Sequence, residues 1–296
     1  MSSHPVIAIV QIAFLLAFWC WVFIAVVFLR NTVLPRMNVP DNLPPSRYQP
    51  VRFTSTDGLW LSGWILRTQE SAPWIILCHG LGTNRADLLE IANGLHGAGY
   101  QILMFDFRAH GQSEGRATSF GWLERHDLEG ALTFLGSHET NHDQLYGLYG
   151  ISMGGSVALM VAAADERIGA VAVESPYHNL EESLGHHLTL LYRLPRWPFL
   201  PFIATVYRLR FGVWPRQMSP IDVIDRISPR PVLIIHGEED ARMPLTTIQA
   251  LADRARPPKE LWIVRGATHL GGLQVDAGEY LSRLVHFFDQ ALKFRP

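Results

Sequence analysis

The chain has 296 residues, of which 48% are apolar and 18% are charged, and its formal net charge is −2 at pH 7. This length and this apolar content are sufficient for one large domain with its own hydrophobic core. The nearly balanced charge argues against a nucleic-acid-binding protein, because binding to phosphates requires a basic surface.

Residues 6–29 are apolar throughout except for Gln11. About 20 apolar residues suffice for a helix to cross a bilayer, so this segment is long enough. A signal peptide fits less well, because residues 1–5 contain no Lys or Arg and residues 27–30 make a poor cleavage site. A buried core helix also fits less well, since such helices rarely lack a polar face over this length. We therefore predict a single transmembrane helix over 6–29.

Residues 30–50 contain five prolines and few periodic apolar positions. This composition predicts an extended linker that runs over the membrane surface. Arginines follow the apolar segment at Arg30, Arg36 and Arg47, whereas the residues before it contain none. Because positive charge is retained on the cytoplasmic side of a membrane, we expect the rest of the chain to be cytoplasmic.

Residues 51–296 alternate between strand-like and helix-like segments. An antiparallel hairpin is expected around the turn at Asp57 and Gly58. Apolar runs predict buried parallel strands at 74–78, 101–105, 145–149, 169–173, 232–236 and 261–264. Helices are expected at 85–98, 120–136, 156–164, 246–255 and 277–294. This alternation predicts an α/β fold, with a mostly parallel sheet covered by helices on both faces.

Residues 177–219 depart from this alternation and lie between two predicted strands. Two interpretations remain open for this block. It is either a helical excursion that fills space, or a lid whose apolar residues line an acyl pocket or contact the membrane. In the second case its arginines would lie near lipid headgroups. They are Arg193, Arg196, Arg208 and Arg210.

A Gly-x-Ser-x-Gly motif occupies residues 150–154, with Ser152 at its centre. It lies between a predicted strand and a predicted helix, which is the context of a nucleophile elbow. The serine of such an elbow sits on a strained turn, so the positions two before and two after it must lack a side chain. The helix that begins there directs its free N–H groups toward any oxyanion formed beside Ser152.

A serine hydroxyl needs a general base, and the base needs an orienting carboxylate. His269 and Asp240 each follow a predicted parallel strand. Because the carboxyl ends of parallel strands meet at one edge of a sheet, we expect both side chains to approach Ser152. Glu238 and Glu239 compete for the role of the acid. Asp240 is preferred for its place after the turn.

The oxyanion hole requires two backbone donors. The N–H group of Met153 follows the nucleophile, and the N–H group of Leu81 lies in the glycine-rich loop after residues 74–78. His79 and His236, at strand ends, are expected to be structural. A polar group after residues 101–105 is interpreted as a network that braces loops, because no spacing in the chain matches a zinc site. It comprises Asp106, Arg108 and His110.

Together these motifs resemble the α/β-hydrolase superfamily. More narrowly, they resemble the membrane-anchored serine hydrolases grouped with prolyl-oligopeptidase-like, monoacylglycerol-lipase-like and serine-aminopeptidase-type enzymes. The motifs are Gly150–Gly154, His79-Gly80, Asp106–Ser113, His236-Gly237 with Asp240, and Gly266–His269. The likeness covers residues 51–294 and implies esterase, thioesterase, lipase or peptidase chemistry without a metal or organic cofactor. The superfamily's dehalogenases and epoxide hydrolases use an Asp nucleophile, and Ser152 argues against them.

The resulting hypothesis is a single-pass, membrane-anchored serine hydrolase that cleaves an acyl ester, thioester or amide. The apolar N-terminal segment favours a lipid or acyl ester over a peptide. Three alternatives remain: an acyltransferase on the same fold, a peptidase, and a non-catalytic binding module. The expected partners are therefore a small acyl substrate and the membrane, and no nucleic acid.

Overall fold

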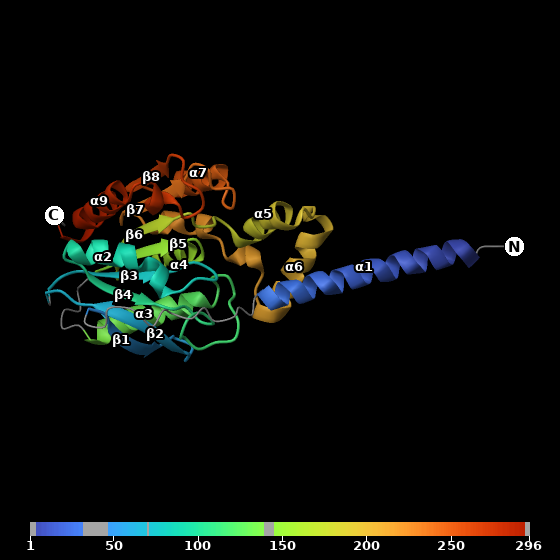
Figure 1. Cartoon of the computed structure of the whole chain (residues 1–296), viewed down its shortest axis with the longest axis horizontal. Coiled ribbons are helices and arrows are strands. Elements are labelled where there is room, and N and C mark those ends of the chain that lie inside the picture. The colour runs from blue at the N-terminus through green and yellow to red at the C-terminus, as the bar shows by residue number, and fades with distance from the viewer. Residues whose placement is uncertain (1–3, 32–46, 70, 139–144, 294–296) are drawn as a thin grey trace.

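The computed structural model describes residues 4–31, 47–69, 71–138 and 145–293. An eight-stranded sheet of order β1-β2-β4-β3-β5-β6-β7-β8 forms its centre (Figure 1). The strands are β1 (Gln49–Thr54), β2 (Trp60–Leu66), β3 (Trp74–Cys78), β4 (Gln101–Phe105), β5 (Tyr146–Ile151), β6 (Ile168–Glu174), β7 (Val232–Gly237) and β8 (Lys259–Val264). β2 pairs antiparallel with β1 and β4, and all other pairs are parallel. The predicted α/β fold with a mostly parallel sheet is confirmed.

Helices cover both faces of this sheet. They are α2 (Leu89–Gly97), α3 (Glu124–His138), α4 (Met153–Ala162), α7 (Leu245–Arg254), α8 (Gly272–Val275) and α9 (Ala277–Phe288). Alternate residues of β3 point to opposite faces: Ile76 belongs to the apolar cluster that contains side chains of α3, α4 and α7, and Ile75 to the cluster that contains side chains of α2 and α9. Both faces are therefore closed by apolar side chains, as the continuous apolar strands require.

Two helix boundaries differ from the prediction for local reasons. The helix expected from residue 85 begins with a 3₁₀ turn, Arg85–Leu88, whose N-terminus is capped by Asn84. The helix expected from residue 120 begins only at Glu124, because its carboxylate binds the preceding loop instead. It accepts the N–H groups of Ser119 and Gly121 at 3.0 and 2.8 Å. The acidic side chain thus holds residues 119–121 in a turn.

The block 177–219 forms a separate helical cap, with α5 (Leu180–Tyr192) and α6 (Arg196–Phe211) as its main elements. Figure 1 shows both helices at one end of the sheet, away from the helices that cover its faces. The cap has its own apolar cluster, which contains Leu188, Ile203 and Tyr207 and extends to Met243 in the loop after β7. The cap is therefore packed onto the carboxyl edge of the sheet.

Among the described residues, one helix is long and apolar enough to cross a membrane: α1 (His4–Asn31), over Pro5–Ile24. Figure 1 shows it projecting away from the domain beside α6. The rings of Trp21 and Phe202 lie 4.9 Å apart, and Ile24 packs against the cap's apolar cluster. Most of the predicted linker lies outside the described residues. The linker's predicted end was wrong by two residues, since β1 already begins at Gln49.

Candidate active site

Ser152 lies in the tight turn between β5 and α4, with φ 49° and ψ −117°. A non-glycine residue in the left-handed region costs on the order of 1–3 kcal/mol, so the surroundings must hold it there. Its N–H group donates to the carbonyl of Glu174 at 2.8 Å. A Cβ on Gly150 would lie 2.5 Å from the Gly154 carbonyl, and a Cβ on Gly154 would lie 2.3 Å from the Cys78 carbonyl. The turn therefore requires glycine at both flanking positions, as the sequence predicted.

The loop after β3 lies directly beside Ser152. A Cβ on Gly80 would be 3.6 Å from the Ser152 Cβ, and both Leu81 and Met153 line the same cavity as Ser152. Met153 is the first residue of α4, so its N–H group has no acceptor within the helix. The two predicted oxyanion donors thus belong to segments that flank the serine.

Two buried histidines brace this loop. His79 Nε2 accepts the N–H group of Phe107 at 2.9 Å, so Nδ1 carries the proton and donates to the Gly80 carbonyl at 2.7 Å. His110 Nε2 accepts the N–H group of Gly82 at 3.1 Å in the same way. Burial lowers the pKa of both imidazoles, which keeps them neutral and able to accept. This arrangement agrees with the structural role expected for His79.

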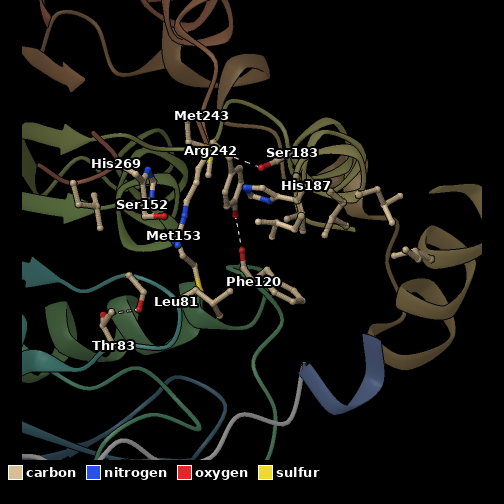
Figure 2. Close-up of a pocket in the computed structure, with 18 of the residues that line it drawn as sticks. Leu81, Thr83, Phe120, Ser152, Met153, Ser183, His187, Arg242, Met243 and His269 are labelled. Atoms are coloured by element: carbon tan, nitrogen blue, oxygen red, sulfur yellow. Dashed lines mark hydrogen bonds between the residues drawn. The ribbon is translucent and has the colours of Figure 1, made fainter. Parts of the chain in front are cut away.

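His269 Nδ1 lies 2.8 Å from Oδ2 of Asp240. Because an ionised carboxylate only accepts, Nδ1 carries the proton and Nε2 is the free nitrogen. Burial raises the pKa of Asp240, but its hydrogen bonds with His269 and the Met243 N–H group outweigh burial and leave the pKa below its usual value. Asp240 is buried, whereas His269 lines the same cavity as Ser152 (Figure 2).

The competing residues that the sequence offered have other positions. Glu238 and Glu239 are exposed, and Glu238 accepts the N–H group of Gly266 at 3.2 Å. His236 is fully buried, with Nδ1 3.1 Å from Ser175 Oγ and 3.8 Å from Asp240 Oδ2. Burial lowers the pKa of His236, in keeping with a neutral side chain that packs at the end of β7. The structure therefore brings Asp240, and neither glutamate, to His269.

Glu174, at the end of β6, was missed by sequence reasoning. Its Oε1 accepts the N–H group of Gly272 at 3.1 Å, in the segment that follows His269. Its Oε2 accepts the hydroxyls of Tyr280 at 2.8 Å and Tyr149 at 3.3 Å. Burial raises the pKa of this carboxyl. Since its carbonyl also holds the Ser152 N–H group, Glu174 connects the serine turn to the His269 loop.

The polar group after β4 forms ion pairs away from the cavity. Asp106 pairs with Arg85, and Arg108 pairs with Asp127 at 2.6 Å and with Asp57 at 2.7 Å. These pairs tie the β1–β2 hairpin and α3 to the loop after β4, as predicted for a bracing network. Within the described part of the chain, no three His, Cys, Asp or Glu side chains gather closely enough to hold a metal ion.

The cavity in front of Ser152 has a volume of about 410 Å³. Leucines from α5 and Ile203 from α6 form the wall that the cap contributes, and Phe120 and Tyr177 also line the cavity. Figure 2 shows His187 on the cap side and Arg242 on the side of Ser152 and His269. This is a largely apolar, concave site with few polar groups, as is typical of small-molecule pockets.

Comparison with known proteins gives the chain its family. The model of the family described as "alpha/beta hydrolase fold" matches residues 73–201. The protein YqkD of Bacillus subtilis is 34% identical over 237 residues, which cover 79% of this chain and 77% of YqkD. This chain belongs to the α/β-hydrolase superfamily.

Solved structures support this assignment over most of the chain. An esterase of Pyrococcus furiosus has a TM-score of 0.72 and 25% identity, and the match covers 88% of this chain and 98% of the esterase. GrgF of Penicillium has a TM-score of 0.67 and 25% identity, with 85% and 100% covered. The predicted superfamily is confirmed. The narrower grouping with membrane-anchored lipase-like and peptidase-like enzymes stays a prediction.

Proposed function

We propose that this α/β hydrolase is a serine hydrolase in which Ser152 is the nucleophile, His269 the general base and Asp240 the orienting acid. The observation that carries the proposal is the 2.8 Å contact between His269 and Asp240, with His269 and Ser152 on one cavity. A histidine held in this tautomer by a buried carboxylate has its free nitrogen available for the serine proton.

The reaction would proceed through an acyl-enzyme. Ser152 Oγ attacks the acyl carbonyl while His269 Nε2 takes its proton, and the N–H groups of Met153 and Leu81 bind the oxyanion. The tetrahedral intermediate expels the alcohol, thiol or amine, which receives the proton from His269. Water, deprotonated by the same nitrogen, then releases the acid and restores Ser152. The chemistry requires no metal or organic cofactor.

The cavity favours an acyl ester with a hydrocarbon chain. Its cap wall consists of leucine and isoleucine side chains, which would bind an acyl chain through burial of apolar surface. The structural likeness to an esterase points in the same direction. A peptide would need polar partners for its backbone, and this wall offers few.

We also propose that α1 anchors the enzyme in a membrane with the cap at its surface. α1 contacts α6 through Trp21, so the cap is the part of the domain beside the helix. The cap exposes large apolar side chains, including Trp197 at 75% and Leu209 at 82%. Its arginines suit the headgroup region. The cytoplasmic orientation remains a proposal that rests on the three arginines after residues 6–29.

A second candidate is an acyltransferase on the same site. The polyketide transferase grgF of Penicillium is 24% identical to this chain over 286 residues, covering 82% of this chain and 97% of grgF. In that case an acceptor other than water would attack the acyl-enzyme. Product analysis with and without added alcohols and amines separates the two, because a transferase yields the acylated acceptor as the main product.

The test uses the full chain in detergent, a fluorophosphonate probe and peptide mapping of the adduct. We expect labelling at Ser152 that disappears in Ser152→Ala and in His269→Ala. Ser183→Ala is the matched control, because Ser183 lines the same cavity and donates to Met243 Sδ rather than to a histidine. Labelling that persists in Ser152→Ala, or a folded protein that the probe never labels, would overturn the proposal and favour a binding module.

A further inference from the structure

Arg242 stands out among the residues that line the cavity. It is the one lining residue with a permanently charged side chain, and none of the lining residues carries a carboxylate. Within the described residues, no carboxylate pairs with its guanidinium, whereas other surface arginines such as Arg167 and Arg283 have such partners. Arg242 therefore brings a positive charge without an ion-pair partner among the described residues to an otherwise apolar site.

The backbone that carries Arg242 is held firmly on both sides. Asp240 Oδ1 accepts the N–H groups of Arg242 and Met243 at 2.9 and 3.0 Å. From the cap, His186 Nε2 lies 2.8 Å from the carbonyl of Ala241, and Ser183 contacts the sulfur of Met243. The base of the Arg242 side chain therefore has a fixed place beside the cavity.

His187 adds a neutral donor to the same cavity. Burial, together with the nearby His186 and Arg242, lowers the pKa of His187 to about 4. At neutral pH its ring is therefore uncharged. The positive charge at this side of the cavity comes from Arg242, and a bound anion would meet no negative side chain on the cavity wall.

We propose that Arg242 binds an anionic group, a carboxylate or a phosphate, on the leaving-group half of the acyl substrate. This inference rests on the proposed serine hydrolase function. Figure 2 shows Arg242 on the same side of the cavity as Ser152 and His269, and all three residues line it. His269 gives its proton to the leaving group, which must therefore lie on that side as well. The acyl chain would then bind along the apolar side chains of the cap, on the other side of the cavity.

The test compares two chromogenic esters with the same acyl chain. In one, the acyl chain is attached to the phenol oxygen of 3-hydroxy-4-nitrobenzoate, so the leaving group carries a carboxylate. In the other, it is attached to the phenol oxygen of methyl 3-hydroxy-4-nitrobenzoate, so the leaving group has no charged substituent. The full chain in detergent should prefer the anionic ester, measured as the ratio of the two kcat/KM values. In Arg242→Gln this ratio should fall about tenfold, because the charge-assisted hydrogen bond to the carboxylate is lost while the neutral ester loses nothing comparable. Arg242→Lys should retain part of the preference.

Arg256→Gln is the matched control. Arg256 is 69% exposed and precedes β8, at the opposite edge of the sheet from the cavity. Its loss changes the net charge equally but should leave the ratio unchanged. A second pair, a monoacylglycerol and its phosphate ester, shows whether phosphate serves as well as carboxylate. If the enzyme prefers the anionic member of only one pair, that pair shows whether Arg242 binds a phosphate or a carboxylate.

The two proposals fail in different ways. If Ser152-dependent hydrolysis occurs but the ratio is the same in the parent and in Arg242→Gln, the anion-binding role of Arg242 is wrong and the serine hydrolase stands. If neither ester is cleaved and the fluorophosphonate does not label Ser152, the proposed function itself is wrong. If the ratio falls equally in Arg256→Gln, the preference reflects the overall charge of the protein and the role of Arg242 is again wrong.

Discussion

The two carboxylate oxygens of Asp240 bind different partners: one binds His269, and the other binds the backbone of Arg242 and Met243. Oδ2 lies 2.8 Å from His269 Nδ1, while Oδ1 accepts two backbone N–H groups of the loop after β7. The carboxylate is therefore fixed in rotation before any substrate arrives. A single side chain both shapes the loop that carries Arg242 and selects the tautomer of the histidine.

Asp240→Asn should lower kcat by about 10³–10⁴-fold, since an amide in place of the carboxylate favours the wrong imidazole tautomer. The loop should survive, because the side-chain oxygen of Asn can still accept the N–H groups of Arg242 and Met243. Steady-state kinetics on a short acyl ester measures the fall in kcat, and thermal unfolding checks that the variant is folded. Glu239→Gln is the control, since Glu239 is exposed next to Asp240. Activity of Asp240→Asn within tenfold of the parent would show that another acid serves His269.

Glu174 is proposed as a positioning residue for both Ser152 and the His269 loop. Tyr280→Phe removes the shortest hydrogen bond of Glu174, 2.8 Å to Oε2, together with the 2.8 Å hydrogen bond between the Tyr280 and Tyr149 hydroxyls. The cost should be about 1–2 kcal/mol of unfolding free energy, because a buried acceptor loses one donor. If the carboxylate positions the active site, kcat should also fall severalfold while KM changes little.

Tyr100→Phe provides the matched control for this experiment. Tyr100 is fully buried and donates to the carboxylate of Asp289 at 2.5 Å, at the other end of α9. Its loss should lower stability to a similar extent without lowering kcat. Equal effects of the two variants on kcat would mean that Glu174 acts through stability alone.

Replacing glycine by alanine should have opposite effects at Gly154, in the turn beside Ser152, and at Gly97, at the end of α2. Gly154→Ala would place a Cβ 2.3 Å from the Cys78 carbonyl and 2.4 Å from the His79 carbonyl, where only backbone could yield. Overpacking of this kind costs about 1–3 kcal/mol. A shift of about 1 Å between the two oxyanion donors should lower kcat by about 10²-fold.

Gly97→Ala is the opposite case. Gly97 closes α2, and a Cβ there would meet nothing within 4 Å. Alanine should stabilise the protein by about 0.5–1 kcal/mol, because it loses less backbone entropy than glycine in a helix. Thermal unfolding and kcat of both variants test the pair. A Gly154→Ala enzyme with parental activity would contradict the packing of the turn described above.

Sequence reasoning succeeded where the information is local. The strands from β3 to β8 follow from apolar runs, and Ser152 follows from glycines that the backbone geometry demands. Glu174 could not be found in this way, because its partner Tyr280 lies 106 residues further along the chain. The one local sign was an acid directly after an apolar strand. The late start of α3 was missed although the contact is local, because a pattern of apolar positions does not show that the Glu124 carboxylate binds the backbone of residues 119 and 121.

We expect the apolar side chains of α5 to set the length of acyl chain that the cavity accepts. Leu184 lines the cavity from α5 and is only partly buried, so a larger side chain can extend into the cavity. Leu184→Trp should lower kcat/KM for long acyl esters by about tenfold or more, since each buried methylene is worth about 0.8 kcal/mol. Esters of short acids should be affected much less.

A series of esters with increasing chain length measures this effect. Leu209→Trp is the matched control, because it makes the same exchange on α6 at a side chain that is 82% exposed and outside the cavity lining. Its chain-length profile should follow the parent, since the added indole projects away from the cavity. If Leu184→Trp also leaves the profile unchanged, the acyl chain does not lie along α5, and the cap has a role other than holding it.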